Sequence, residues 1–214
     1  MKKRLAGLLA SGLLVFGSAG LASALVITNG SFEGTGDLGS YSTLSAGSTA
    51  IEGWTIVSGT IDWIQNYWQH SDGSRSLDLS GSTSGTMAGF VFDTMVGQSY
   101  RVLFDMAGNP DGGPTIKTLQ ASIYPPAMAN TFTFDTAGKT LDNMGWETKW
   151  FDFTATHFFT TLYFGDISGD PGFYGAALDN VRVVEYAPVP EPGTLLLLGA
   201  GLMGLAYAKR RRKE

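Results

Sequence analysis

Tyr100-Arg101-Val102-Leu103-Phe104-Asp105-Met106 is the stretch that decides the fold of this 214-residue chain. Every second residue, beginning with Tyr100, is large and apolar, so these side chains share one face of an extended strand. Phe132 and Phe134 repeat the same two-residue period further along the chain. The pattern predicts strands that bury one face.

Short runs of β-branched and aromatic residues alternate with turn-forming Gly, Ser, Asn, Asp and Pro. Nine such runs predict strands at residues 54–64, 76–79, 86–93, 100–106, 117–124, 131–135, 149–154, 160–164 and 177–186. Between them no segment has the period of a helix. This spacing predicts an all-β fold, a β-sandwich or jelly roll.

The N-terminus predicts a signal peptide over residues 1–24. Met1-Lys2-Lys3-Arg4 is basic, residues 5–16 are apolar, and Ala22-Ser23-Ala24 is a small-residue cleavage site. A retained membrane anchor is the alternative. Cleavage would make Leu25 the first residue of the mature chain.

The C-terminus predicts a transmembrane segment at residues 194–208, followed by a basic tail at 209–214. A helix of this length extends about 22 Å at about 1.5 Å per residue, which is short against a hydrocarbon core of about 30 Å. A buried core helix is the alternative. Basic residues at both ends predict that the ends stay in the cytoplasm and that residues 25–193 are exported.

Residues 187–193 form a proline-rich linker that contains Pro190-Glu191-Pro192. Each proline fixes its own φ and favours an extended residue before it. The motif, the apolar run and the basic tail together resemble a PEP-CTERM sorting tail. The resemblance implies export across the inner membrane of a Gram-negative bacterium, contact with the membrane through the C-terminal helix before processing, cleavage by an exosortase, and a final place in the cell envelope or outside the cell.

The exported segment is acidic and has no cysteine. Residues 25–193 contain six basic and 18 acidic residues. Such a charge excludes nucleic-acid binding by neutralisation of phosphates, and it suits extracellular life and cation binding. The absence of cysteine excludes disulfides, thiol catalysis and thiolate metal sites.

Motifs along residues 25–186 resemble the exported bacterial domains called choice-of-anchor C, whose relatives include a plant cell-wall domain of unknown function. The matching motifs, in order, are Asn29-Gly30-Ser31-Phe32-Glu33, Gly53-Trp54-Thr55-Ile56, Ile61-Asp62-Trp63-Ile64, Asp72-Gly73-Ser74-Arg75-Ser76-Leu77-Asp78-Leu79, Ala107-Gly108-Asn109-Pro110, Asn143-Met144-Gly145-Trp146 and Leu178-Asp179-Asn180-Val181. The resemblance implies a galactose-binding-like jelly roll.

The same resemblance implies a structural Ca²⁺ that ties the first strand to the last. Its carboxylate ligands would be Glu33 and Asp179, with backbone carbonyls near Asn29 and in the turn at residues 72–75 completing the shell. Six to eight oxygen ligands are what Ca²⁺ requires. In the alternative reading, the two acids cap turns or pair with arginine.

Catalytic patterns are sparse, and we expect no enzyme activity. The chain has two histidines, His70 and His157, and none of the usual hydrolase or nucleotide-binding motifs. Asp62 and Asp78 could form the carboxylate pair of a glycoside hydrolase, although acids at turns and strand edges are the more common case.

Aromatic residues give the better indication of function, because sugars lay their C–H faces on exposed rings. We expect Trp54 and Trp63 to be core residues. Adjacent Tyr67 and Trp68 fall in a predicted loop and are the first candidates for a ligand platform. The second candidates are Asn109 and Asp111. The sequence therefore predicts a non-catalytic module that binds extracellular polysaccharide, with a structural matrix protein lacking a sugar site as the alternative.

Overall fold

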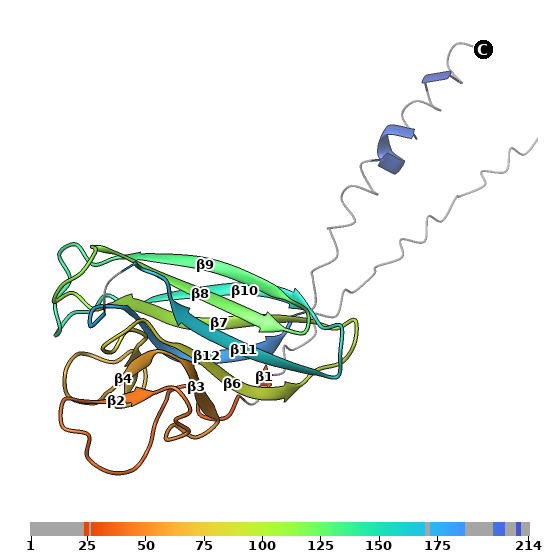
Figure 1. Ribbon diagram of the computed structural model, residues 1–214. Coiled ribbons are helices and arrows are strands. Elements are labelled where there is room, and N and C mark those ends of the chain that lie inside the picture. Colours follow the sequence, from red (N-terminus) through yellow and green to blue (C-terminus); the bar gives the residue numbers. More distant parts are fainter. Residues whose placement is uncertain (1–23, 26, 170–171, 187–198, 204–208, 211–214) are drawn as a thin grey trace, which may run out of the picture.

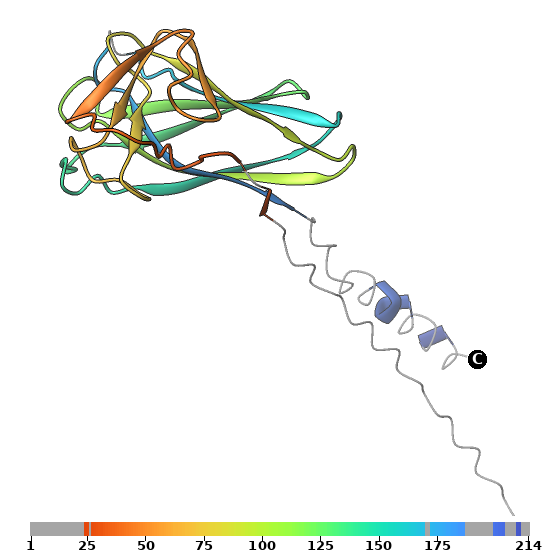
Figure 2. The same ribbon diagram turned by 90° about the horizontal axis from the view of Figure 1, so that it is seen from below.

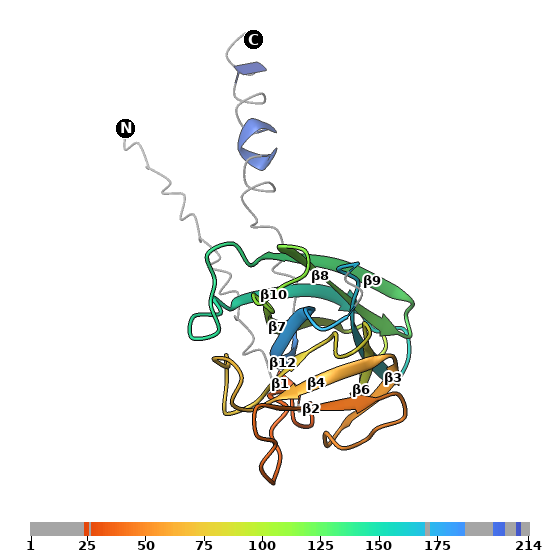
Figure 3. The ribbon, with the colours of Figure 1, turned by 60° about the vertical axis from the view of Figure 1, so that its left-hand side comes forward.

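The computed structural model describes residues 24–25, 27–169, 172–186, 199–203 and 209–210 (Figure 1). In this part of the chain, twelve strands form two antiparallel sheets that pack face to face. The predicted all-β sandwich is confirmed. Figure 3 shows the two layers, with strands β10 to β2 along one side and β9, β8, β6 and β3 along the other.

The larger sheet has seven strands. Its order is β10 (Glu147–Thr154), β7 (Ser99–Gly108), β12 (Ala176–Glu185), β5 (Ser76–Asp78), β4 (Thr60–Ile64) and β2 (Tyr41–Ser45), with β1 (Ala24–Leu25) also paired to β12. Figure 2 shows β1 beside the end of β12, where Ala24 lies opposite Val184. The first and last strands of the domain therefore lie together.

The smaller sheet has five strands. Its order is β3 (Trp54–Ser58), β6 (Thr86–Asp93), β11 (Phe159–Asp166), β8 (Ile116–Tyr124) and β9 (Met128–Asp135). Each pair in both sheets is antiparallel. Short connections suffice between such strands, which fits the turn signals in the sequence.

The alternating face of β7 forms the centre of the core. Tyr100, Val102, Phe104 and Met106 are each at most 1% exposed. The Phe104 ring makes edge-to-face contacts with Phe132 of β9 and Phe164 of β11, with ring centroids 5.1 Å apart in both pairs. Because β7 belongs to one sheet and these two partners to the other, this ring joins the two layers.

A single strand at residues 54–64 was the wrong prediction. The segment divides into β3 and β4, which belong to different sheets. Gly59 makes the break with a φ of 63°, and a Cβ at this position would lie 2.0 Å from the carbonyl oxygen of Ser84. Only glycine combines this backbone angle with so close an approach.

Two described strands were not predicted, β1 and β2. The β2 sequence Tyr-Ser-Thr-Leu-Ser is mostly polar, and its side chains are exposed or half-buried. Its strand conformation comes from pairing with β4, where Tyr41 lies opposite Ile64. Tertiary pairing therefore decides the structure of a segment that has a weak local pattern.

The terminal predictions fall mainly outside the described residues. These are the signal peptide except Ala24, the linker at 187–193, and most of the apolar run and basic tail. Residues 199–203 and 209–210 are helical. Within the described residues, no helix has the length and hydropathy needed to span a membrane.

The two sheets form a self-contained unit. The buried apolar side chains that we can assign to the core run from Phe32 to Val183. Residues 24–186 contain both complete sheets and all of these side chains. We therefore treat this segment as a domain that folds independently.

Replacing Phe104 by alanine tests the joint between the sheets. We expect the Phe104→Ala variant to lose about 3–5 kcal/mol of unfolding free energy, because a large buried ring leaves a cavity that only partly collapses. Urea denaturation followed by tryptophan fluorescence measures the change. Val57→Ala is the control, since Val57 is 51% exposed on β3. A Phe104→Ala loss no larger than that of the control would contradict the central role of this ring.

Candidate functional site

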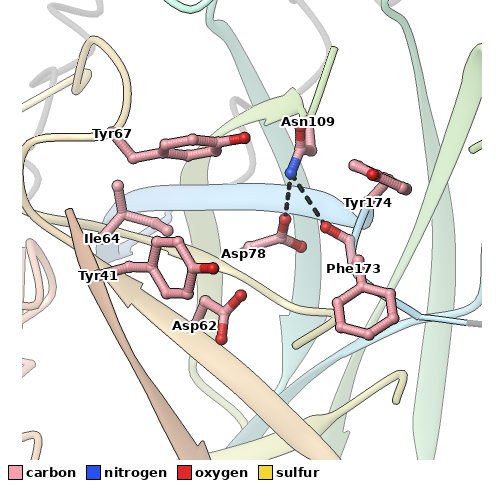
Figure 4. Close-up of a pocket in the computed structure, with 8 residues that line it drawn as sticks. All are labelled: Tyr41, Asp62, Ile64, Tyr67, Asp78, Asn109, Phe173 and Tyr174. Carbon is pink, nitrogen blue, oxygen red and sulfur yellow. Dashed lines mark hydrogen bonds between the residues drawn. The ribbon is translucent and has the colours of Figure 1, made fainter. Parts of the chain in front are cut away.

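A pocket of about 150 Å³ lies where the β2–β4–β5 part of the larger sheet meets three loops (Figure 4). The sheet contributes Tyr41, Asp62, Ile64 and Asp78. Loops contribute Tyr67 after β4, Asn109 after β7, and Phe173 and Tyr174 before β12. The lining residues are thus four aromatic rings, two carboxyl groups, one carboxamide and one aliphatic side chain.

Strand register brings the two carboxyl groups together. Asp62 lies directly opposite Asp78 across the β4–β5 pair. Directly opposed residues project to the same side of a sheet, so both side chains reach the pocket. Their neighbours Trp63 and Leu77, which are also opposed, project to the other side and are buried.

Asp78 is held by a closed set of hydrogen bonds. Its side chain is 1% exposed. One carboxyl oxygen accepts the backbone N–H groups of Ser80 at 2.9 Å and Gly175 at 3.0 Å. The other accepts the carboxamide N–H of Asn109 at 2.9 Å. These contacts fix Asn109 and the segment before β12 around the buried carboxyl group.

Burial changes the acidity of both carboxyl groups. Desolvation raises the pKa of Asp78 to about 8, although hydrogen bonds from Asn109, Ser80 and Gly175 act in the opposite direction. Desolvation also raises the pKa of Asp62, against a hydrogen bond from Thr43. Taking two neighbouring carboxylates out of water disfavours their charged forms.

Aromatic side chains form the walls of the pocket. Tyr67 and Tyr41 meet edge to face, with centroids 5.6 Å apart. The Tyr67 hydroxyl donates a hydrogen bond to Asp111 at 2.5 Å. Burial of Tyr67 raises the pKa of its hydroxyl above the usual range, and the Asp111 carboxylate raises it further. Phe173 and Tyr174 line the pocket from the loop before β12 (Figure 4).

The structure brings three of the four predicted ligand residues together. Tyr67 binds Asp111, and the Asp111 N–H donates to the Asn109 side chain at 3.0 Å. Asn109 in turn contacts Asp78. The two loops that we considered separately therefore form one site.

Trp68 was a wrong choice as a ligand platform. It is 5% exposed, packs in the hydrophobic core, and donates its indole N–H to the Ser76 hydroxyl at 2.8 Å. So little of the side chain is exposed that it does not form an open platform for a sugar ring. Its neighbour Tyr67 is the member of the pair that reaches the pocket.

Sequence reasoning missed Tyr41, Phe173 and Tyr174 as site residues. Tyr41 lies on the unpredicted strand β2, and Phe173 and Tyr174 lie in a glycine-flanked loop. Nothing in the local sequence shows that these segments meet. Asp62 and Asp78 were considered only as a catalytic pair.

A second, more open depression of about 340 Å³ shares Tyr67 with the pocket. Its other lining residues are mostly polar: Gln65, Asn66, Trp68, Gln69, His70 and Asp142. Tyr67 is therefore a common wall of two adjoining hollows, and an extended ligand could occupy both.

The predicted calcium ligands Glu33 and Asp179 accept hydrogen bonds from opposite ends of the turn at residues 71–75. Glu33 accepts the backbone N–H groups of Ser74 at 2.8 Å and Arg75 at 3.0 Å. Asp179 accepts those of Ser71 and Asp72, both at 2.9 Å. Carboxylates from the start and the end of the domain thus grip the turn at 71–75.

Asn29 supports this arrangement. Its side-chain oxygen accepts the Glu33 N–H at 2.7 Å, and its amide donates to the Glu33 carbonyl at 2.9 Å. Burial raises the pKa of Asp179 to about 7, against the backbone hydrogen bonds that it accepts.

The predicted donor set has two carboxylates and relies on backbone carbonyls for its other ligands. The described residues contain no group of three His, Cys, Asp or Glu side chains placed to hold an ion. These contacts match the alternative reading, in which the acids cap a turn. Calcium binding stays a prediction.

Comparison with known proteins identifies the family of the domain. A family model described as "Protein of unknown function (DUF642)" matches residues 25–184. The chain belongs to this family. A second model, for the PEP-CTERM protein-sorting motif, matches residues 188–212. This motif marks an exported protein that is sorted to the cell surface.

The DUF642 chain is 34% identical over 183 residues to Halomucin of Haloquadratum walsbyi. The match covers 83% of this chain and 2% of Halomucin, so it concerns a small part of that protein. The name choice-of-anchor C is not tested by these matches and stays a resemblance.

Among solved structures, the arabinose-bound α-L-arabinofuranosidase MgGH51 is similar with a TM-score of 0.50 and 13% identity, over 78% of this chain and 27% of that one. The module CBM35 from Paenibacillus barcinonensis has a TM-score of 0.45 and 17% identity, over 69% of this chain and 99% of that one. The likeness to the arabinofuranosidase structure concerns the fold alone.

The raised pKa of Asp78 predicts a dependence of stability on pH. The folded protein holds this proton more tightly than the unfolded chain, so the Asp78 contribution is complete below about pH 4 and is lost as pH rises toward 8. We expect the unfolding free energy of Asp78→Asn to fall less steeply over this range than that of the wild type. The two slopes should differ by at most about 1.4 kcal/mol per pH unit. Urea denaturation at several pH values measures both slopes. Parallel slopes would contradict the prediction.

Calcium binding has a direct test on melting temperature. If Glu33, Asp179 and Asn29 help to hold the ion, Ca²⁺ added to chelator-treated protein raises the melting temperature. At a free concentration 100 times Kd the gain is about 2.7 kcal/mol. The control is the Glu33→Gln variant, in which the rise should shrink. An unchanged wild-type melting temperature would mean that hydrogen bonds alone hold the turn.

Proposed function

We propose that this DUF642 domain is a non-catalytic carbohydrate-binding module and that the pocket around Tyr67 is its site. The supporting observation is the convergence of Tyr41, Tyr67 and Tyr174 with Asn109 and Asp62 at one concave place. Aromatic faces suit the C–H surfaces of a sugar ring, and a few fixed polar groups suit its hydroxyls.

The size of the site favours recognition of part of a chain. A pocket of about 150 Å³ is smaller than typical ligand pockets of about 300–1,000 Å³. One sugar unit would enter it only in part. The adjoining depression of about 340 Å³ offers space for the next units. We therefore propose an extracellular polysaccharide as the ligand, in preference to a free monosaccharide.

Glycoside hydrolysis is the second candidate, because Asp62 and Asp78 oppose each other. Retaining glycosidases hold two carboxyl groups about 5–5.5 Å apart on either side of the bond to be cleaved. Here both groups belong to neighbouring strands on the same wall, and both Asp78 oxygens accept hydrogen bonds. This arrangement supports binding without cleavage.

The sorting tail supports a place for this binding. We propose that an exosortase recognises Pro190-Glu191-Pro192 and processes the tail, after the apolar run at 194–208 has held the precursor at the membrane. A polysaccharide site would then retain the processed domain in the cell envelope or matrix. The alternative is a structural matrix protein that acts through protein contacts.

Replacing Tyr67 by alanine tests the proposed site. We expect Tyr67→Ala to weaken binding to the recognised glycan at least tenfold, since stacking and the hydrogen-bonded position of Asp111 are both lost. A glycan array and the polysaccharide of the native host provide the ligands, and calorimetry on residues 24–186 measures affinity.

Trp150→Ala is the matched control, because Trp150 is also an exposed aromatic residue, 52% exposed, and lies on β10 away from the pocket. Equal losses in both variants would place the site elsewhere. Wild-type protein that binds no glycan would favour the structural matrix role, and release of reducing ends would favour hydrolysis.

A further inference from the structure

The small pocket is lined by acidic side chains and by no basic ones. Two of its lining side chains, Asp62 and Asp78, are carboxyl groups that are 8% and 1% exposed. Another acid, Asp111, lies outside the lining and accepts a hydrogen bond from the Tyr67 hydroxyl. The lining residues include no lysine, arginine or histidine. The lining therefore holds two buried carboxyl groups and no basic side chain that could balance their charge when they ionise.

Basic side chains of the described residues do not line the pocket. Arg101 pairs with Asp152, and Lys149 pairs with Glu147. Lys117 reaches the loop that carries Tyr174, where its ammonium group donates to the carbonyl oxygens of Gly112 and Tyr174. Lys117 is not a lining residue of the pocket.

Asp62 presents an oxygen that the fold does not use. Its Oδ1 accepts the Thr43 hydroxyl, whereas Oδ2 accepts no hydrogen bond from the described residues. The side chain is more than nine-tenths buried and lines the pocket. Figure 4 shows this carboxyl group beside Asp78 and the Tyr41 hydroxyl. An acceptor that no group of the protein uses is available to a donor group of a ligand.

The rings around these acids also favour a cation. Tyr41, Tyr67 and Tyr174 line the pocket on more than one side (Figure 4). An aromatic face attracts an ammonium group, most strongly in a desolvated site. A neutral hydroxyl could donate to Asp62, whereas an ammonium group would also stabilise the ionised carboxylate, the form that burial disfavours.

We infer that the sugar bound in this pocket carries a free primary ammonium group, which is the chemistry of an amino sugar with no acetyl group. The inference rests on the proposed function and specifies its ligand. The ammonium would donate to Asp62 Oδ2 and lie against the tyrosine rings. An N-acetyl group has one N–H donor, no charge, and a carbonyl that a carboxylate repels.

Matched oligosaccharides test the inference. Residues 24–186 are titrated calorimetrically with a glucosamine tetramer, the N-acetylglucosamine tetramer, and putrescine as an amine without a sugar ring. The titrations are run at several pH values from mildly acidic to neutral, because the amine must be protonated and Asp62 must be ionised. We expect the glucosamine tetramer to bind at least tenfold more tightly than the other two. Added salt should weaken that binding, because the contact is between charges.

The variant Asp62→Asn isolates the charge. The amide can still accept the Thr43 hydroxyl, and we expect the preference for the glucosamine tetramer to fall to threefold or less. Asp93→Asn is the matched control, since Asp93 is an exposed acid at the end of β6 with the same formal charge. The control should keep the wild-type preference. A melting curve verifies that each variant folds.

The outcomes separate this inference from the proposed function. A glucosamine preference that depends on Asp62 supports both. Equal or tighter binding of the acetylated or another neutral oligosaccharide overturns the inference and leaves a sugar-binding module. Putrescine binding as tight as the glucosamine tetramer overturns the inference in favour of simple amines. No binding of any saccharide overturns both.

Discussion

The rest of the structure depends on the hydrogen bonds by which two carboxyl groups hold the turn at residues 71–75. Glu33 comes from the start of the domain and Asp179 from its last strand, and each accepts two backbone N–H groups of this turn. In a chain without cysteine, this contact takes the place of a covalent link between distant segments. Hydrogen bonds to an ionised carboxylate are the stronger kind, and Asp179 is mainly ionised above its raised pKa of about 7.

The position of this turn determines the position of the pocket. The segment before it carries Tyr67, and the strand after it, β5, carries Asp78. Displacing the turn would therefore move an aromatic wall and a buried carboxyl group at the same time. The hydrogen bonds from the turn to Glu33 and Asp179, which we call the clamp, also fix the Asp179 side chain close to the place where β12 pairs with β5. Any ion bound near Glu33 would act on the site through this turn, because neither clamp residue lines the pocket.

The sequence predicts those features of the fold that depend on neighbouring residues in the chain. Alternation along β7 depends on the order of residues alone, so the buried face from Tyr100 to Met106 was predicted correctly. The break at Gly59 was not, because its cause is the approach of Ser84 from another part of the chain. The polar strand β2 depends on its partner β4 in the same way.

The site was partly predictable for the same reason. Tyr67 and Trp68 are adjacent and aromatic, but the sequence does not say which one is buried. The Ser76 hydroxyl that binds Trp68 decides this. The opposed pair Asp62 and Asp78 required the register of β4 against β5, which the sequence does not supply.

Charge links the pocket to the environment of the exported domain. Residues 25–193 contain 18 acidic and six basic residues, so the domain surface repels anionic polymers and attracts cationic ones at long range. At physiological ionic strength this attraction extends about 8 Å, which makes it a guide for encounter and not a source of specificity. Specificity would have to come from groups that water does not screen. The carboxyl groups of Asp62 and Asp78 are such groups, because burial has already removed their solvent. The acidic surface would then attract a cationic polysaccharide first, and the pocket would bind one of its charged groups afterwards.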